Sequence, residues 1–582
     1  MNTEWSLKEI YTGLDDPAYE ADMACAEEKI RELGEFLKTA DEKSWKELAE
    51  GGLSLMEELE SKFDKLGLYI SLRQSVETEN GDLMAQMNRV MKMVAGVAPF
   101  QAALEKLLAK IPDVDELAGE SELVREYTFR LKEIKKDAVH LLSDEVEEMA
   151  ASMNMNAGSA WSQLQAYLTS TVGVDYDGGQ VTLSEIRNLA YSADAAVRRA
   201  AYEAELAAYE KIKDPIAFSI NNIKNQVTML CEKRGYESPL AMTLEQSRMK
   251  RETLDALMEA IREYLPVFRK YMHRNAELLG HKNGLPWYDL FAPLGKEDKK
   301  YTIEEAKDYL IRTFEKFSPD MSDLMRDAFE QEWIDFYPRK GKEGGAFCAG
   351  VTMLKQSRIL TNYDGTLGAI RTLSHELGHA FHNRQKEDGR ILNQSYPMPV
   401  AETASTFNEV HLGEAALAVA TDEEKLALLE DDLREYTQTI VDIYSRYLFE
   451  TAVFEQSRGK FLMAEDLKQL MLDAQRKAYG DGLDENFLHP YMWVCKSHYY
   501  RESLSFYNFP YAFGNLFAAG LYAMFRREGE PFVEKYKAML AATPCCTIEE
   551  AAAMMGIDVT QKAFWEESLA EVAKKVDAFC AL

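Results

Sequence analysis

The helical spacing of apolar residues is the feature that most limits how this chain can fold. In "TLDALMEAIREYLPVFRKYMHRNAELLG", residues 253–280, apolar side chains recur at i, i+3, i+4 and i+7, which is the pattern of a helix with one buried face. Similar segments recur along the chain, and each must pack its apolar face against another element. The sequence therefore predicts a mainly α-helical protein. Because 582 residues are too many for one small core, we predict an N-terminal helical region over residues 1–195 and a second domain over residues 196–582.

Strand signals are few and fall in two places. The segment "VDYDGGQVTL", residues 174–183, has a Gly-Gly turn between two β-prone runs and predicts a short hairpin. The segment "GGAFCAGVTMLKQSRILTNYDGT", residues 344–366, contains two short β-like runs that lead into Asp364 and Gly365, which resemble a helix start. A small β-sheet is therefore expected directly before the next helix.

Charge and composition exclude several classes of function. The net charge of −31 would repel the phosphates of nucleic acid. The most apolar run, residues 506–525, contains Asn508, Pro510 and Asn515, so it predicts a buried helix with its approach loop and not a membrane span. The N-terminal segment lacks the basic and apolar regions of a secretory signal, and the seven scattered cysteines fit a reducing compartment. We therefore expect a cytoplasmic protein.

The segment "TLSHELGHAFHNR", residues 372–384, places His375 and His379 one helical turn apart. At about 100° per residue, the two imidazoles lie opposite the apolar face of the same helix. That face comprises Ile370, Leu373, Leu377 and Phe381. Two imidazoles on successive turns can bind one Zn²⁺, and Glu376 beside them can reach a metal-bound water. This is the arrangement of an HExxH metallopeptidase.

A third metal ligand must come from another segment. The metzincin pattern HExxHxxGxxH continues with a glycine and a third histidine, but His382 and Gln385 occupy those positions here. The next helical segment, "VAETASTFNEVHLGEAAL", carries Glu402 and Glu409 seven residues apart, hence on one face. Glu402, near the start of this helix, is the better ligand. Glu409 suits a supporting position in which it accepts the other N–H of a ligating histidine.

Several segments, taken in order, resemble the thimet oligopeptidase and oligoendopeptidase F family of zinc metallopeptidases. They are "PRKGKEGGAFC", "HELGHAFH", "AETAS" and "SHYYRESLSFYNFPYAFG", and the opening "WSLKEIYTGLDDP" resembles the oligoendopeptidase F branch. The resemblance implies a large two-lobed helical body with a deep substrate channel and a small, zincin-like β-sheet beside the HExxH helix. It implies zinc on the channel floor and cleavage of short peptides. It also implies that "SRILTNY", residues 357–363, is an edge strand that pairs with the substrate backbone.

The same resemblance assigns residues in the C-terminal part of the chain. The family pattern has a histidine and tyrosines there, which fall at His498, Tyr507 and Tyr511 and would hold the oxyanion of the tetrahedral intermediate. The Pro and Gly of this stretch favour a loop over the metal. A further family tyrosine falls at Gly514 in this sequence. We expect His382 to support the site by hydrogen bonding.

The sequence therefore predicts a zinc-dependent endopeptidase that acts on short peptides, with residues 196–582 as its catalytic domain. His375, His379 and Glu402 would bind one Zn²⁺ per chain, and Glu376 would act as general base. Two alternatives stay open. The first is a zinc exopeptidase, for which no feature that fixes a free terminus is identified. The second is a non-catalytic peptide-binding protein on the same scaffold, against which the intact Glu376 argues. The sequence leaves the oligomeric state open.

Overall fold

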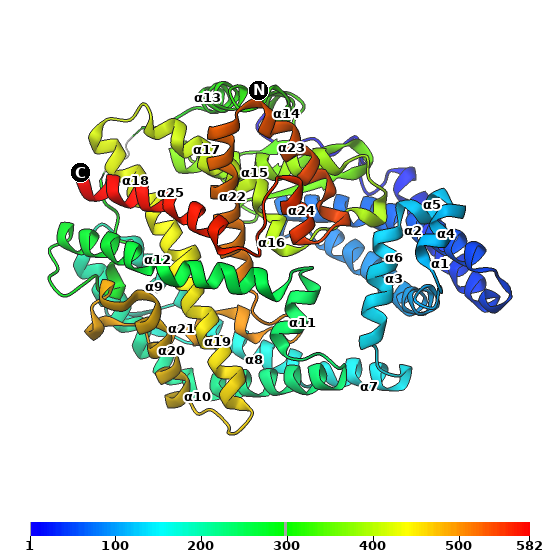
Figure 1. Cartoon of the computed structure of the whole chain (residues 1–582), viewed down its shortest axis with the longest axis horizontal. Helices are drawn as coiled ribbons and strands as arrows, with labels where there is room; N and C mark the ends of the chain where they lie inside the picture. Colours follow the sequence, from blue (N-terminus) through cyan, green and yellow to red (C-terminus); the bar gives the residue numbers. More distant parts are fainter. Residues whose placement is uncertain (1, 296–298) are drawn as a thin grey trace.

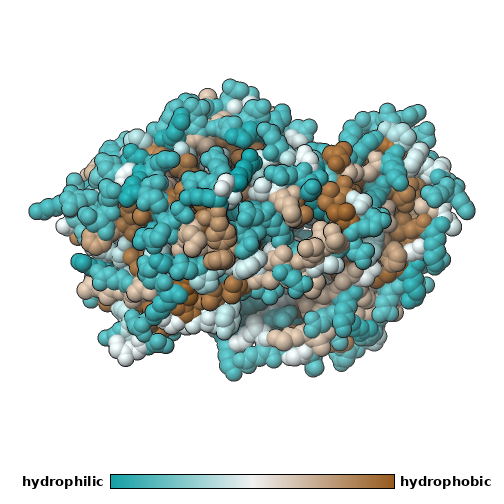
Figure 2. Space-filling model, turned by 90° about the horizontal axis from the view of Figure 1, so that it is seen from below, coloured by the Kyte–Doolittle hydropathy of each residue, from teal (hydrophilic) through white to brown (hydrophobic). Residues whose placement is uncertain are grey.

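The computed structural model describes residues 2–295 and 299–582. Helices dominate these residues, which confirms the predicted mainly helical class. Figure 1 shows a large helical body with the first helices of the chain gathered at one side of it. Figure 2 shows that the surface is indented between a larger and a smaller part, as expected for a two-lobed molecule.

Two small cores lie among the N-terminal helices. In order, these helices are α1 (Pro17–Lys38), α2 (Trp45–Val76), α3 (Gly81–Leu108), α4 (Val114–Glu120), α5 (Glu122–Glu126) and α6 (Thr128–Asp137). Ser44 and Glu47 form a capping box that fixes the start of α2. One core contains only residues of these helices and their connections, whereas the other also includes Val351 and Leu360 from the small sheet. The predicted division of the chain at residue 195 stays a prediction.

The middle of the chain contains the predicted hairpin and the longest helix. The helices are α7 (Asp144–Asn154), α8 (Gly158–Thr171), α9 (Leu183–Asn188), α10 (Ala195–Lys233), α11 (Pro239–Gln246) and α12 (Arg251–Leu278). Strands β1 (Val174–Tyr176) and β2 (Gly179–Val181) pair antiparallel, so the hairpin prediction is confirmed. The apolar face expected for residues 253–280 is buried along α12.

The second sheet lies beside the HExxH helix and has three strands. After α13 (Ile303–Glu315) and α14 (Pro319–Glu330) come β3 (Ile334–Asp335), β4 (Phe347–Val351) and β5 (Gln356–Leu360). The strand order is β3-β5-β4, with β5 parallel to β3 and antiparallel to β4. The prediction that residues 357–363 form an edge strand is wrong, because β5 has a partner on both sides. In the described part of the chain, β4 is the edge strand of this sheet next to α15.

The first residues of the chain are bound to this sheet. The Ser6 amide donates to the Glu332 carbonyl at 2.8 Å, and the Phe336 amide donates to the Thr3 carbonyl at 3.0 Å. The buried guanidinium of Arg358 on β5 donates to the Ser6 carbonyl at 2.7 Å. The N-terminal segment therefore completes the sheet from its far side.

The remaining helices build the largest core around the HExxH helix. They are α15 (Leu367–Lys386), α16 (Met398–Ala401), α17 (Thr403–Leu417), α18 (Asp422–Tyr436), α19 (Ile443–Ser457), α20 (Ala464–Tyr479), α21 (Met492–Cys495), α22 (Phe509–Glu528), α23 (Glu530–Ala542), α24 (Ile548–Met554) and α25 (Lys562–Ala581). Helix α15 packs on α17, α17 packs on α22, and α22 packs on α25. None of the helices in the described residues has the length and apolar character needed to cross a bilayer.

Candidate metal centre and active site

Helix α15 presents two imidazoles on the side opposite its buried face. The Thr366 side chain caps the first turn of the helix. The four residues of the predicted apolar face, Ile370, Leu373, Leu377 and Phe381, are fully buried. His375 and His379 are only partly buried, and their ring centroids lie 4.9 Å apart. The amphipathic helix expected from the sequence is therefore confirmed.

Gly378 lets a second helix approach α15 between the two histidines. A Cβ at this position would lie 2.5 Å from the carbonyl oxygen of Ala404 and 2.6 Å from the Cα of Ser405, which is far inside contact distance. Helix α17 therefore crosses α15 at the turn that separates the histidines. Because Glu402 directly precedes α17, this close crossing brings its carboxylate to the two imidazoles.

Three potential ligand atoms converge on one point. Oε2 of Glu402 lies 3.2 Å from Nε2 of His375 and 3.3 Å from Nε2 of His379. Two donors bound at about 2.1 Å to one tetrahedral ion lie about 3.4 Å apart, so this donor set fits a single Zn²⁺. Among the described residues, no other group of His, Cys, Asp and Glu side chains comes close enough together to hold a metal ion.

Two further contacts orient the potential ligands. Oε1 of Glu409 lies 3.1 Å from Nδ1 of His375, so Nε2 of the same ring is left for the space beside Glu402. The Ser405 hydroxyl donates to Oε2 of Glu402 at 2.8 Å. A carboxylate on the second nitrogen of a ligating histidine is the usual support of a metal site. Glu409 thus lies against the second ring nitrogen of His375, and its role in supporting a metal ligand stays a prediction.

The electrostatics of this group favour positive charge beside Glu402. Burial disfavours a charged His375 ring, but hydrogen bonds to Glu402 and Glu409 outweigh burial and raise the pKa of His375 to about 10. Burial also disfavours the ionised form of Glu402, yet hydrogen bonds to the two imidazoles hold the pKa of this carboxyl well below its usual range. A divalent cation would supply the same charge in place of the protons.

Glu376 has a different environment from Glu402, although it lies on the same helix as the histidines. Its side chain is 6% exposed. Burial raises the pKa of its carboxyl, while the neighbouring His375 and His379 oppose that rise. A carboxyl group that is shielded from bulk water and holds its proton more tightly than usual can exchange a proton during a reaction.

The predicted C-terminal residues form one aromatic cluster. The ring of His498 lies 4.7 Å from that of Tyr507 and 6.2 Å from that of Tyr511, measured between centroids, and the two phenol rings are 5.8 Å apart. Burial, a hydrogen bond with Tyr507 and the charge of Glu402 all raise the pKa of Tyr511. Tyr511 lies three residues before Gly514, where an added Cβ would be 3.4 Å from the Cβ of Glu402, so α22 holds both on the side of the potential metal ligands. The predicted loop is partly wrong, because α22 begins at Phe509 and Tyr511 lies in its first turn.

The hydrogen bonds of His498 indicate which of its two ring nitrogens carries the hydrogen. Oδ1 of Asn508 lies 2.9 Å from Nδ1 of His498 and accepts from Nη1 of Arg446 at 3.1 Å. Because the amide oxygen of Asn508 can only accept, Nδ1 of His498 must donate and therefore carries the hydrogen. Burial lowers the pKa of His498, and nearby cations lower it further. The neutral ring therefore presents Nε2 as an acceptor, so the tyrosine hydroxyls are the better donors to an oxyanion.

His382 and Gly514 are two further positions that the sequence singled out. His382 is fully buried, stacks on Tyr396 and has Nε2 2.8 Å from the Thr543 hydroxyl. This hydrogen bond anchors α15 to the segment after α23 and does not reach a potential metal ligand. At Gly514, an added Cβ would lie 3.4 Å from the Cβ of Glu402. Position 514 therefore faces Glu402 at ordinary contact distance, but glycine supplies no hydroxyl there.

Sequence reasoning missed Gly378, Arg371 and Asn508. A glycine inside a regular helix often marks a close approach, and the Gly378 of "HELGH" carried that signal. Arg371 precedes His375 by four residues and therefore lies on the same side of α15. Asn508 had no comparable signal, because its contacts with His498 and Arg446 depend on how distant segments pack.

The helical fold, the sheet beside α15, and the two histidines of the HExxH helix together with Glu402 define a metallopeptidase. Comparison with protein families extends this assignment. The model described as Peptidase family M3 matches residues 188–571, and the model described as Oligopeptidase F matches residues 112–172. The chain belongs to peptidase family M3.

Known relatives match along nearly the whole chain. Oligopeptidase PepF of Bacillus subtilis is 26% identical and covers 98% of this chain and 86% of its own length. An oligoendopeptidase F homolog of Lactococcus lactis is 26% identical over 98% of this chain and 97% of its own. Among solved structures, oligoendopeptidase-F from Enterococcus faecium has a TM-score of 0.69 at 22% identity and covers 95% of this chain and 98% of its own. At this identity the structural likeness establishes the fold.

Proposed function

We propose that this metallopeptidase is a zinc-dependent endopeptidase that cleaves internal bonds of short peptides. The observation that carries the proposal is the convergence of Glu402 Oε2 on the Nε2 atoms of His375 and His379, at 3.2 and 3.3 Å. These three residues would hold one Zn²⁺ per chain. When bound, zinc acts as a Lewis acid and lowers the pKa of water to about 7.

The chain's own residues would then move protons and hold charge. Glu376 takes a proton from the attacking water and returns it to the leaving nitrogen, because it lies beside the ligands and its burial raises its proton affinity. The hydroxyls of Tyr507 and Tyr511 donate to the oxyanion of the tetrahedral intermediate. His498 orients this pair of phenols through its ring contacts.

The form of the molecule supports short, extended substrates. The indentation between the two parts (Figure 2) would admit a single chain more readily than a folded domain. Strand β4, the edge strand next to α15, offers backbone groups to an extended peptide, and such pairing gives affinity without demanding particular side chains. The relatives named oligoendopeptidase F support the same class of substrate. We also propose a cytoplasmic location, because scattered cysteines suit a reducing compartment.

Peptides blocked at both termini test this proposal. Internally quenched peptides of roughly 5 to 20 residues should be cut at internal bonds, because a chain about one strand wide fits where stacked sheets, about 10 Å apart, do not. Mass spectrometry of the products distinguishes the alternatives. Cleavage only of peptides with a free terminus would establish an exopeptidase, and binding without any product would establish a peptide-binding protein. Chelation should abolish cleavage, and added Zn²⁺ should restore it.

A further inference from the structure

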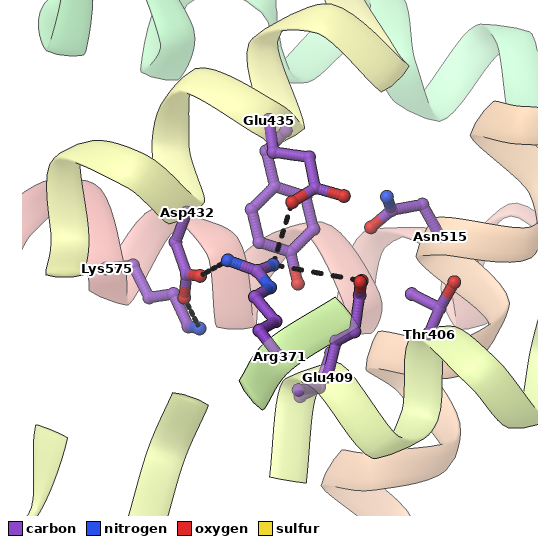
Figure 3. A pocket seen from close by; sticks show the side chains of 9 residues that line it. Arg371, Thr406, Glu409, Asp432, Glu435, Asn515 and Lys575 are labelled. Atoms are coloured by element: carbon purple, nitrogen blue, oxygen red, sulfur yellow. Dashed lines mark hydrogen bonds and ion pairs between the residues drawn. The ribbon is translucent and has the colours of Figure 1, made fainter. Parts of the chain in front are cut away.

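A cluster of buried and partly buried charges lies directly behind the metal centre. We name it the Arg371 cluster, and Figure 3 shows the side chains of its members other than Asp431. Its members are Arg371 on α15, Glu409 on α17, Asp431, Asp432 and Glu435 on α18, and Lys575 on α25. Four helices, of which α25 is far from the other three in the sequence, therefore meet one turn before His375.

Arg371 is the centre of this cluster. Its Nη1 lies 2.8 Å from Oδ1 of Asp432 and 3.3 Å from Oδ2 of Asp431. Its Nη2 lies 2.8 Å from Oε2 of Glu435 and 3.9 Å from Oε2 of Glu409. The acids of α18 therefore orient the planar guanidinium, while its Nη2 still faces Glu409. The several N–H groups of arginine allow it to contact all of these carboxylates at once. Lys575 closes the far side, with Nζ 2.6 Å from Oδ2 of Asp432.

The two oxygens of Glu409 face different partners. Oε1 lies 3.1 Å from Nδ1 of His375, and Oε2 lies 3.9 Å from Nη2 of Arg371. The carboxylate is 13% exposed, so water provides little of its stabilisation. Arg371 forms an ion pair with this second oxygen, and its charge attracts the carboxylate on the side away from the histidine.

The charge balance of the cluster depends on Arg371. Four carboxylates, those of Glu409, Asp431, Asp432 and Glu435, lie within 4.0 Å of its guanidinium nitrogens. Lys575 neutralises Asp432, and Arg434 shares Asp431. Neither of these cations has an ion pair with Glu409. Loss of Arg371 would therefore leave Glu409 among like charges, and repulsion would move its carboxylate.

We propose that Arg371 is a positioning residue for the metal site: its guanidinium holds Glu409 on Nδ1 of His375 and thereby fixes Nε2 toward the metal. The inference rests on the proposed function, since it assumes that His375 is a ligand. It adds that α18 and α25, which supply no metal ligand in that function, set the direction of one ligand through Arg371.

Metal affinity of the apoprotein tests this role without depending on turnover. We expect Arg371→Met to lower Zn²⁺ affinity about 10-fold, the lower end of the range for residues behind metal ligands. Titration against a competing chelator measures this affinity, and circular dichroism reports the fold. Arg371→Lys keeps the charge but not the fork, so it should also lose affinity and serves if Arg371→Met does not fold. Wild-type affinity in either folded variant would overturn the inference.

Arg434→Met is the matched control, because it removes a cation from the same acidic helix without touching Glu409. Its Zn²⁺ affinity should stay within about twofold of wild type, because Arg434 shares only Asp431 with Arg371 and has no ion pair with Glu409. A double-mutant cycle then tests the route. In the Glu409→Gln background, Arg371→Met should cause little further loss, because its target is gone.

The outcomes of the cycle separate the two proposals. Losses that add in full would show that Arg371 acts independently of Glu409 and would overturn the inference, as would an equal loss in Arg434→Met. If the wild-type apoprotein itself binds no Zn²⁺, the proposed function fails and this inference fails with it. If the wild-type protein binds Zn²⁺ tightly and the Arg371 variants bind it equally tightly, the proposed function stands and the inference alone is wrong.

Discussion

Replacement of Gly378 by alanine should damage the metal centre more than it damages the fold. A Cβ at this position would lie 2.5 Å from the Ala404 carbonyl oxygen and 2.6 Å from the Cα of Ser405. Both are backbone atoms, so relief requires α17 to move away from α15 by roughly 1 Å, and such overpacking costs about 1–3 kcal/mol. Alanine gains about 1 kcal/mol of helix propensity over glycine. The net loss of stability should therefore be small, about 0–2 kcal/mol.

The effect on function should be much larger, because α17 begins next to Glu402. A shift of about 1 Å in a reacting group can cost about 10²-fold in rate, and the same shift would separate the Glu402 carboxylate from the imidazoles. We expect kcat/KM for a quenched peptide to fall about 100-fold, with weaker Zn²⁺ binding and a nearly unchanged melting temperature. Gly96→Ala is the control, since Gly96 lies inside α3 with open space around it and should gain stability without loss of activity. Wild-type metal affinity and turnover in Gly378→Ala would refute this reasoning.

Three further predictions concern the residues at the centre. Glu376→Gln should keep the bound metal but lose about 10²–10⁴ in rate, the range for a positioned general base; wild-type turnover with metal bound would exclude that role. Glu402→Ala should lower Zn²⁺ affinity sharply, whereas Glu409→Ala should lower it about 10–100-fold, and metal titrations that rank the two in the opposite order would exchange their roles. Tyr507→Phe or Tyr511→Phe should reduce kcat and kcat/KM together by about 10²–10³, while a packing role would instead lower the melting temperature and spare turnover.

The sequence predicted the elements whose signals are local. The buried face of α15 follows from the helical repeat of Ile370, Leu373, Leu377 and Phe381, all fully buried. The hairpin at residues 174–181 follows from its Gly-Gly turn. The spacing of Glu402 and Glu409 predicted that both would face the histidines, because seven residues are close to two helical turns.

Features that depend on distant pairing were not predictable in this way. Strand β5 became central because β3, only two residues long, pairs with it in parallel, and so short a strand gives no periodic signal. The helical position of Tyr511 was also not predicted, because the stretch around it contains Pro and Gly. Pro510 stands at the start of α22, where proline is well tolerated, and did not mark a loop.

The attachment of the first residues to the sheet has a consequence for how this protein matures during synthesis. Arg358 reaches back 352 positions to Ser6, and Lys575 reaches back 143 positions to Asp432. Contacts so remote in the sequence form slowly, and a chain emerging from the ribosome makes them in the order in which their partners appear. The helix with the two histidines would thus lack the contact that Lys575 adds behind it until α25 has been translated. A chain that has not reached α25 would carry the motif but not the assembled centre, which would delay peptide cleavage until α25 has been made.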